Sequence, residues 1–296
     1  MKRQSIATLV LLAALWGGSF PLMRVAVPEF GPLPLMALRS AIGAAVLLPM
    51  LILGGHTASL RDRPAHALVV GVLNSAVPFA LFAWAQQFIP AGLNAILNAT
   101  TPFWAALVAW FWFGERIGRL PLAGMLIGFS GVLVLIWERA SLQSAGSAWA
   151  IVAALAATLH YGLAANYSRR FLVGANPIAI ATASQLSALG LLSPGALVTL
   201  PQSMPSTTAW IAVGALGVLC TGIAYALFYW LIEAVGAARA TTVTFLVPLS
   251  ALVWGNVLLG EQVTLDMALG GLLVLTGTAL TLGLRWGNPL RSSTNQ

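Results

Sequence analysis

The chain has 296 residues, of which 59% are hydrophobic and 7% are charged, against about 25% charged in a typical soluble domain. Because so few charged groups cannot cover a water-exposed surface, the composition excludes a soluble domain and predicts an integral membrane protein. The net charge is +7, and the single cysteine, Cys220, excludes an intramolecular disulfide.

Apolar segments of about 20 residues, the length of one bilayer crossing, alternate along the chain with short polar or Gly/Pro-rich breaks. We therefore predict an all-α membrane protein with ten spanning helices. They cover residues 5–27, 33–54, 65–86, 92–113, 119–137, 148–170, 176–197, 208–230, 238–259 and 265–285.

Part of the first half of the chain recurs in the second half. Residues 226–264 match residues 80–118 after a shift of 146 positions without a gap. The shift pairs Pro102 with Pro248 and Gly114-Glu115 with Gly260-Glu261. A match of this length at a fixed period indicates two copies of one unit. The predicted units are residues 1–143 and 144–287, followed by a polar tail at 288–296.

The odd number of spans in each unit makes the second repeat cross the membrane upside down relative to the first. Inverted repeats are typical of secondary transporters, whose binding site lies between the repeats near the bilayer midplane. Basic residues set the orientation, because they collect in cytoplasmic segments. With both termini cytoplasmic, these segments carry Lys2, Arg3, Arg61, Arg63, Arg116, Arg119, Arg169, Arg170, Arg239, Arg285 and Arg291.

Two motifs suggest a family. Residues 16–20 of the first span read Trp-Gly-Gly-Ser-Phe, and proline followed by Gly-Glu marks the fourth and ninth spans. With these motifs, residues 5–285 resemble the EamA type of the drug/metabolite transporter superfamily, and within it the bacterial YddG-type exporters of aromatic amino acids. The resemblance implies a bacterial inner-membrane exporter of amino acids with aromatic, apolar or small neutral side chains, working by alternating access through a central cavity. Hydrophobic drugs or other metabolites are the alternative cargo.

Several kinds of chemistry are excluded by what the spans lack. The acidic residues all lie in predicted loops or at span ends, namely Glu29, Asp62, Glu115, Glu138, Glu233, Glu261 and Asp266. The usual carboxylate proton relay of a pump is therefore missing, and we expect uncoupled transport. Lys2 is the one lysine, so no phosphate-binding Gly-Lys-Ser/Thr loop exists for ATP. We expect no cofactor, metal or nucleic acid; the expected partners are lipid and a small-molecule substrate, and a monomer would suffice.

Polar and aromatic residues near the span midpoints are candidates to line the cavity: Trp16, Asn74, Asn98, Thr101, His160, Tyr161, Tyr225 and Thr244. Prolines four residues after Asn74, Asn98 and Thr244 remove backbone hydrogen bonds to their carbonyls. Free carbonyls at membrane depth are tolerated where protein re-satisfies them or where they line a wet cavity. The predicted hinges are Pro21, Pro78, Pro102 and Pro248.

Other interpretations of these residues stay open. Asn and Thr also hold helices together by hydrogen bonds. Arg24 and Arg39 are expected to snorkel outward, or, for Arg39, to hold a substrate carboxylate. From a different class, Ser130 in a Gly-x-Ser-Gly string together with His160 would suit an intramembrane serine protease. However, Gly124, Gly128 and Gly131 around that serine also match a close helix-packing face.

Overall fold

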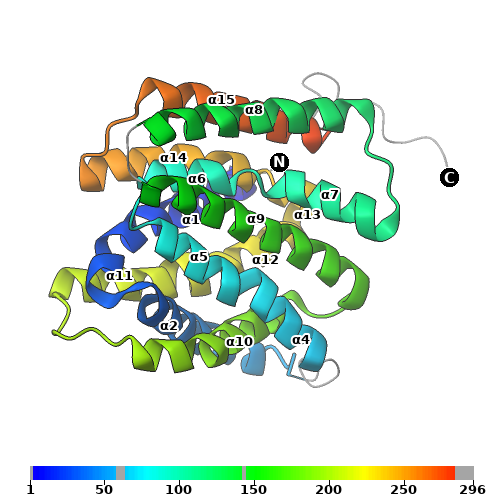
Figure 1. Cartoon of the computed structure of the whole chain (residues 1–296). Helices are drawn as coiled ribbons and strands as arrows, with labels where there is room; N and C mark the ends of the chain where they lie inside the picture. Colours follow the sequence, from blue (N-terminus) through cyan, green and yellow to red (C-terminus); the bar gives the residue numbers. More distant parts are fainter. Residues whose placement is uncertain (1–2, 58–63, 142–144, 284–296) are drawn as a thin grey trace.

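The apolar segments form helices because a helix satisfies its backbone N–H and C=O groups within its own segment, as lipid requires. The computed structural model describes residues 3–57, 64–141 and 145–283 (Figure 1). The helices of the first half are α1 (Arg3–Phe30), α2 (Pro32–Leu53), α4 (Pro64–Gly71), the π-helical turn η1 (Val72–Ala76), α5 (Val77–Ala85), α6 (Ala91–Asn98), α7 (Thr101–Phe113) and α8 (Arg119–Ser141). Those of the second half are α9 (Ala145–Phe171), α10 (Pro177–Val198), α11 (Thr207–Gly217), the π-helical turn η2 (Val218–Ile223), α12 (Ala224–Val235), α13 (Ala237–Ala240), α14 (Val243–Leu259) and α15 (Leu265–Thr281).

These elements confirm the predicted all-α fold. By length and composition, eight helical segments of the described chain can cross a membrane, and α14 and α15 are two shorter apolar helices. Three helices run past their predicted ends by three or more residues, α1 to Phe30 rather than 27, α8 to Ser141 rather than 137, and α12 to Val235 rather than 230. A helix longer than the hydrocarbon core simply continues into the headgroup region. The last helix, α15, ends at Thr281 and not at the predicted 285, and residues 282–283 form a turn. The repeat boundary at 143/144 and the tail 288–296 lie outside the described residues.

Equivalent helices of the two halves pack in equivalent ways. On α1, a Cβ added to Gly17 would lie 2.8 Å from the backbone nitrogen of Ala251 in α14. On α9, a Cβ added to Gly162 would lie 2.8 Å from the backbone nitrogen of Ala105 in α7. Because Ala105 and Ala251 are related by the repeat shift, exchanging the two halves converts one helix pair into the other. The halves are thus related by a two-fold pseudo-symmetry.

The pair formed by α8 and α15 lies on this pseudo-symmetry axis. The two helices lie side by side at the top of Figure 1. A Cβ on Gly277 would lie 2.4 Å from the Gly124 carbonyl oxygen, and one on Gly131 would lie 2.7 Å from the Gly270 oxygen. The repeat shift converts the first contact into the second. Small residues let the two backbones approach this closely, which confirms the predicted helix-packing face.

Two of the helical irregularities also repeat. The turns η1 and η2 begin at Val72 and Val218, positions that the repeat shift superimposes. Pro78 follows η1, but Ala224 occupies the equivalent position after η2, so a proline is not required for the turn. Single π-helical turns often accompany functional sites. Both turns adjoin the cavity described next.

Candidate functional site

A cavity of about 360 Å³ lies between the two halves, where α1, α2, η1, α5, α9, η2, α12 and α14 converge on the break between α6 and α7. This volume falls in the range of small-molecule sites. Seven of the eight predicted residues line it, namely Trp16, Asn74, Asn98, Thr101, Tyr161, Tyr225 and Thr244. Both halves contribute, as expected for a site at the interface of inverted repeats.

Aromatic rings form much of the cavity wall. The Trp16 ring lies 5.1 Å from the Phe228 ring and 6.4 Å from the Tyr225 ring, measured between centroids. The Asn74 amide donates a hydrogen bond to the Tyr225 hydroxyl at 3.3 Å and thereby joins η1 to α12. The Phe82 ring lies 6.0 Å from that of Tyr161. This wall suits an apolar or aromatic group of a ligand.

His160 is the predicted residue that the structure leaves out of the cavity lining. Its ring Nδ1 lies 2.8 Å from the carbonyl oxygen of Ala156, one turn back on α9. Successive residues of an α-helix point about 100° apart. His160 therefore points about 100° around the helix axis from Tyr161, which does line the cavity. Contrary to the prediction, the structure does not bring His160 into the lining.

The break in the fourth span shows how freed carbonyls are satisfied. Pro102 cannot donate to the carbonyl of Asn98, and the Thr101 hydroxyl donates to that carbonyl at 2.8 Å. The next carbonyl, of Ala99, accepts a hydrogen bond from the Thr278 hydroxyl of α15 at 2.8 Å. Thr101 therefore both satisfies the backbone and lines the cavity, so the two interpretations of this threonine do not compete.

The four predicted hinges occupy different environments. Pro102 is the second residue of α7, just after the break, and also lines the cavity; Pro78 is the second residue of α5, just after η1. Pro21 and Pro248 lie inside the continuous helices α1 and α14. A hinge at each of the four stays a prediction, and the interrupted geometry favours Pro102 and Pro78.

Several cavity residues were not predicted from the sequence, namely Ser19, Phe20, Met23, Phe79, Phe82, Cys220, Phe228, Tyr229 and Val247. Two signals pointed to some of them. Phe82 and Phe228 are superimposed by the repeat shift, and Ser19 and Phe20 close the Trp-Gly-Gly-Ser-Phe motif. Apolar residues such as Val247 carry no signal of this kind, because a cavity wall and a helix contact use the same residue types.

Arg39 also lines the cavity, so the expectation that it snorkels outward is wrong. Its side chain is only 7% exposed. The Nε–H donates to the Thr221 hydroxyl at 3.0 Å, and the guanidinium carbon lies 4.1 Å from the centroid of the Phe79 ring. The Thr221 hydroxyl itself donates to the Leu216 carbonyl at 2.9 Å, which leaves its lone pairs for Arg39. These contacts hold the cation between α2, α5 and η2.

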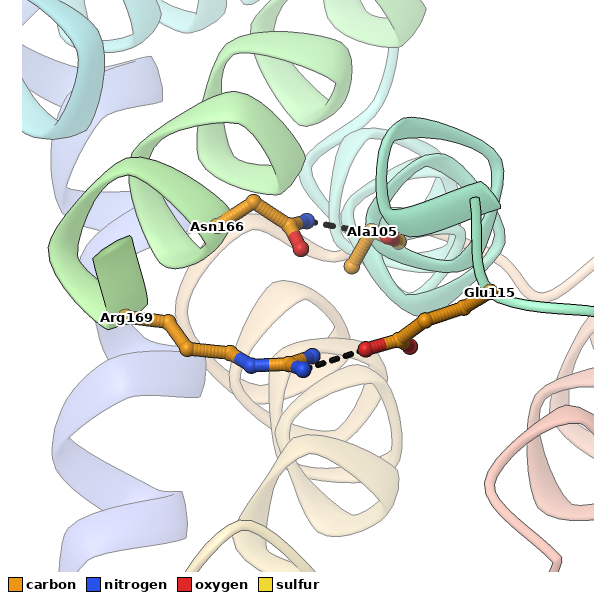
Figure 2. A network of polar contacts seen from close by, with 4 residues as sticks. All are labelled: Ala105, Glu115, Asn166 and Arg169. Atoms are coloured by element: carbon orange, nitrogen blue, oxygen red, sulfur yellow. Dashed lines mark hydrogen bonds and ion pairs between the residues drawn. The ribbon is translucent and has the colours of Figure 1, made fainter. Parts of the chain in front are cut away.

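The repeat-equivalent acids Glu261 and Glu115 have different partners. The carboxylate of Glu261 accepts a hydrogen bond from the backbone N–H of Ala91, at the start of α6, at 3.0 Å. Glu115 instead forms an ion pair with Arg169 of α9 (Figure 2). The hydrogen bond from Arg169 lowers the pKa of the Glu115 carboxyl. The two acids are therefore not equivalent in this structure, although their positions in the repeats are.

The serine protease interpretation has no geometric support. The Ser130 hydroxyl donates to the carbonyl of Ile127 in its own helix at 2.7 Å. The His160 ring is bonded to its own helix as well. A catalytic pair needs the two side chains bonded to each other.

Cysteine labelling checks the cavity assignment. On a Cys220→Ala background, we expect a water-soluble thiol reagent to modify cysteines at Asn98 and Thr244 at least about tenfold faster than one at Val257, because the reactive thiolate forms only where water reaches it. Val257 is 67% exposed on the outer face of α14 and serves as the lipid-facing control. Equal rates at all three positions would show that the cavity is not wet.

Comparison with known proteins agrees with this architecture. The profile of the EamA-like transporter family matches the chain twice, over residues 4–137 and 148–283. Similar proteins include "Uncharacterized transporter YvbV" of Bacillus subtilis, 24% identical over 94% of this chain and 92% of the relative. "Uncharacterized inner membrane transporter YedA" of Escherichia coli is 25% identical, covering 93% and 90%. "Probable terminal-alkyne amino-acid exporter" of Streptantibioticus cattleyicolor is 27% identical, covering 95% and 96%.

One solved crystal structure superimposes with a TM-score of 0.66 at 22% sequence identity, over 93% of this chain and 96% of the other. This likeness concerns the fold alone. The two family matches together span most of the chain, and eight of the helical segments that they cover are long and apolar enough to cross a membrane. The protein is therefore a multi-pass membrane protein that belongs to the EamA-like transporter family, a family of transporters and not of enzymes.

Proposed function

We propose that the protein exports amino acids with aromatic, apolar or small neutral side chains across the bacterial inner membrane. The observation that carries this proposal is the cavity between the repeats, which places a buried cation, Arg39, and amide and hydroxyl groups beside an aromatic wall. Such a lining suits a carboxylate and an apolar side chain on one small molecule. One relative is named as a probable terminal-alkyne amino-acid exporter and another as an uncharacterized inner membrane transporter, and with the resemblance to YddG-type exporters they support the same cargo and membrane.

Alternating access is supported by a difference between the two ends of the cavity. At one end α6 packs on α14, with Gly92 against Leu252 and with Glu261 bonded to the start of α6. Among the described elements, α7 and α13 form no comparable interface at the other end. Inverted repeats can exchange their conformations, so that the second end closes while the first opens. In that state the repeat symmetry assigns the role of Glu261 to Glu115.

The orientation expected from the basic residues assigns each end of the cavity to one side of the membrane. With both termini in the cytoplasm, Glu261 lies at the outer end and Glu115 at the cytoplasmic end. The closed end is then the outer one, and the site faces the cytoplasm, the side from which an exporter loads. Uncoupled transport fits the lining, because none of the acidic side chains that the structure describes lies in it and His160 is not part of it. Cargo would then move down its own gradient.

Counterflow in liposomes tests the proposal. We expect purified protein to give saturable counterflow of labelled phenylalanine, tryptophan, threonine or methionine, with protein-free liposomes as the control. A Trp16→Ala variant should weaken the counterflow of phenylalanine about tenfold or more, since a buried aromatic contact is lost. If only hydrophobic or quaternary ammonium drugs showed counterflow, the amino-acid proposal would be contradicted and the alternative cargo supported.

A further inference from the structure

Arg39 is a buried cation whose partners among the described residues are all neutral. Besides Thr221 and the Phe79 ring, its Nη1 lies 4.0 Å from the sulfur of Met23. The described cavity lining contains no aspartate or glutamate. A buried charge is costly unless a group of opposite sign compensates it, and an ionisable residue inside a membrane usually marks a substrate or ion path. Thr221 and Phe79 position the guanidinium but do not neutralise it.

The contacts leave donors of Arg39 free at the cavity surface. A guanidinium has five N–H donors in a planar fork. The Nε–H is bonded to Thr221, and the contact of Nη1 with sulfur is long and weak. The other donors have no partner in the part of the chain that the structure describes. A planar fork with adjacent free donors matches the two oxygens of a carboxylate in a bidentate pair.

An ammonium group would meet only neutral partners among the described lining residues of this cavity. The groups that could accept its hydrogen bonds are neutral, such as the amide of Asn98 and the hydroxyls of Tyr161 and Tyr229. An ammonium would also be repelled by Arg39. The charge balance therefore favours a ligand that brings one negative charge and an apolar body to lie along the aromatic wall.

Building on the proposed function, we propose that Arg39 binds the carboxylate of the cargo and that the α-ammonium group is dispensable. The site then accepts monocarboxylates with an apolar or aromatic body as well as amino acids, and it rejects amines. A monocarboxylate carries one net negative charge outward in each cycle, whereas a zwitterion carries none. A membrane potential that is negative inside therefore drives monocarboxylate export without a coupled ion.

Three compounds that share one ring and chain length separate the charge contributions: phenylalanine, 3-phenylpropanoate and 2-phenylethylamine. In liposomes, we expect 3-phenylpropanoate to be transported and to compete with phenylalanine within about threefold of unlabelled phenylalanine. We expect 2-phenylethylamine to compete roughly 10- to 100-fold more weakly, the range for loss of a hydrogen-bonded charged partner. An imposed potential, negative inside, should accelerate efflux of 3-phenylpropanoate and leave efflux of phenylalanine unchanged.

Variants assign the selectivity to Arg39. Arg39→Gln keeps a donor for Thr221 and should abolish the preference for 3-phenylpropanoate over 2-phenylethylamine, whereas Arg39→Lys should retain part of it. The control is Arg24→Gln, because Arg24 lies outside the cavity lining and donates to the backbone carbonyl of Gln86. If Arg39→Gln does not fold, the three compounds still test the proposal on the unaltered protein.

The outcomes separate this proposal from the amino-acid function. Transport of phenylalanine with equal competition by the amine and the carboxylate would overturn the role of Arg39 and leave the amino-acid function standing. Transport of 3-phenylpropanoate without transport of phenylalanine would overturn the amino-acid function and leave the carboxylate-binding role of Arg39 standing. Transport of neither, or unchanged selectivity in Arg39→Gln, would overturn the carboxylate site.

Discussion

A Gly277→Ala variant is expected to lose at least about 3 kcal/mol of stability, toward the upper end of the cost of overpacking. The added Cβ would lie 2.4 Å from the carbonyl oxygen of Gly124 and 2.5 Å from the backbone nitrogen of Gly128. Both are backbone atoms, so no side-chain rotation relieves the overlap and α8 and α15 must separate. In a membrane, close packing of small residues supplies much of the attraction between helices.

Thermal unfolding in detergent measures this effect. We expect the apparent melting temperature of Gly277→Ala to fall by about 10 °C. Gly214→Ala is the matched control, because Gly214 also lies in a helix and an added Cβ there would meet no atom within 4 Å. If both variants had the same apparent melting temperature as the unaltered protein, the close packing of α8 on α15 would be contradicted.

A Glu261→Gln variant is expected to open the closed end of the cavity. The carboxylate lies 3.0 Å from the N–H of Ala91, at the helix end where a negative charge is most favourable. An amide keeps one acceptor oxygen but loses the charge. A charged hydrogen bond contributes about 1.5–3 kcal/mol, so the balance between the two conformations should shift roughly tenfold or more toward opening.

Labelling at Leu252 reports the opening, because Leu252 packs on Gly92 at the same interface. On a Cys220→Ala background, a cysteine introduced by Leu252→Cys should react at least about tenfold faster with a water-soluble thiol reagent in Glu261→Gln than in the parent, in proportion to the population opened. The control is Glu115→Gln, the repeat-equivalent change, which breaks an exposed ion pair and should leave the introduced cysteine protected. If the two variants reacted alike, Glu261 would not hold this end closed.

Much of the architecture was predictable from the sequence because lipid restricts the choices. Each apolar run had to be a helix, and the match of Pro102 and Glu115 with Pro248 and Glu261 indicated two repeats. Seven predicted polar and aromatic residues do meet at one cavity, because polar side chains at membrane depth face the bundle interior. The depth of a residue in the membrane follows from its position along the spanning segment, which the sequence gives directly.

The direction of a side chain around the helix axis cannot be read in this way when the helix is apolar on all sides. His160 and Tyr161 have nearly the same depth, yet only Tyr161 faces the cavity. For Arg39 the sequence left two expectations open, snorkelling outward or holding a substrate carboxylate. Thr221 and Phe79 can contact its guanidinium only because η2 and α5 pack beside α2. The sequence by itself thus determined the helices, their duplication and the depth of the polar residues. The tertiary structure alone decided which side chains meet, that the buried cation Arg39 contacts no anion among the described residues, and that Glu261 rather than Glu115 binds a helix end. These features depend on which helix faces lie against each other.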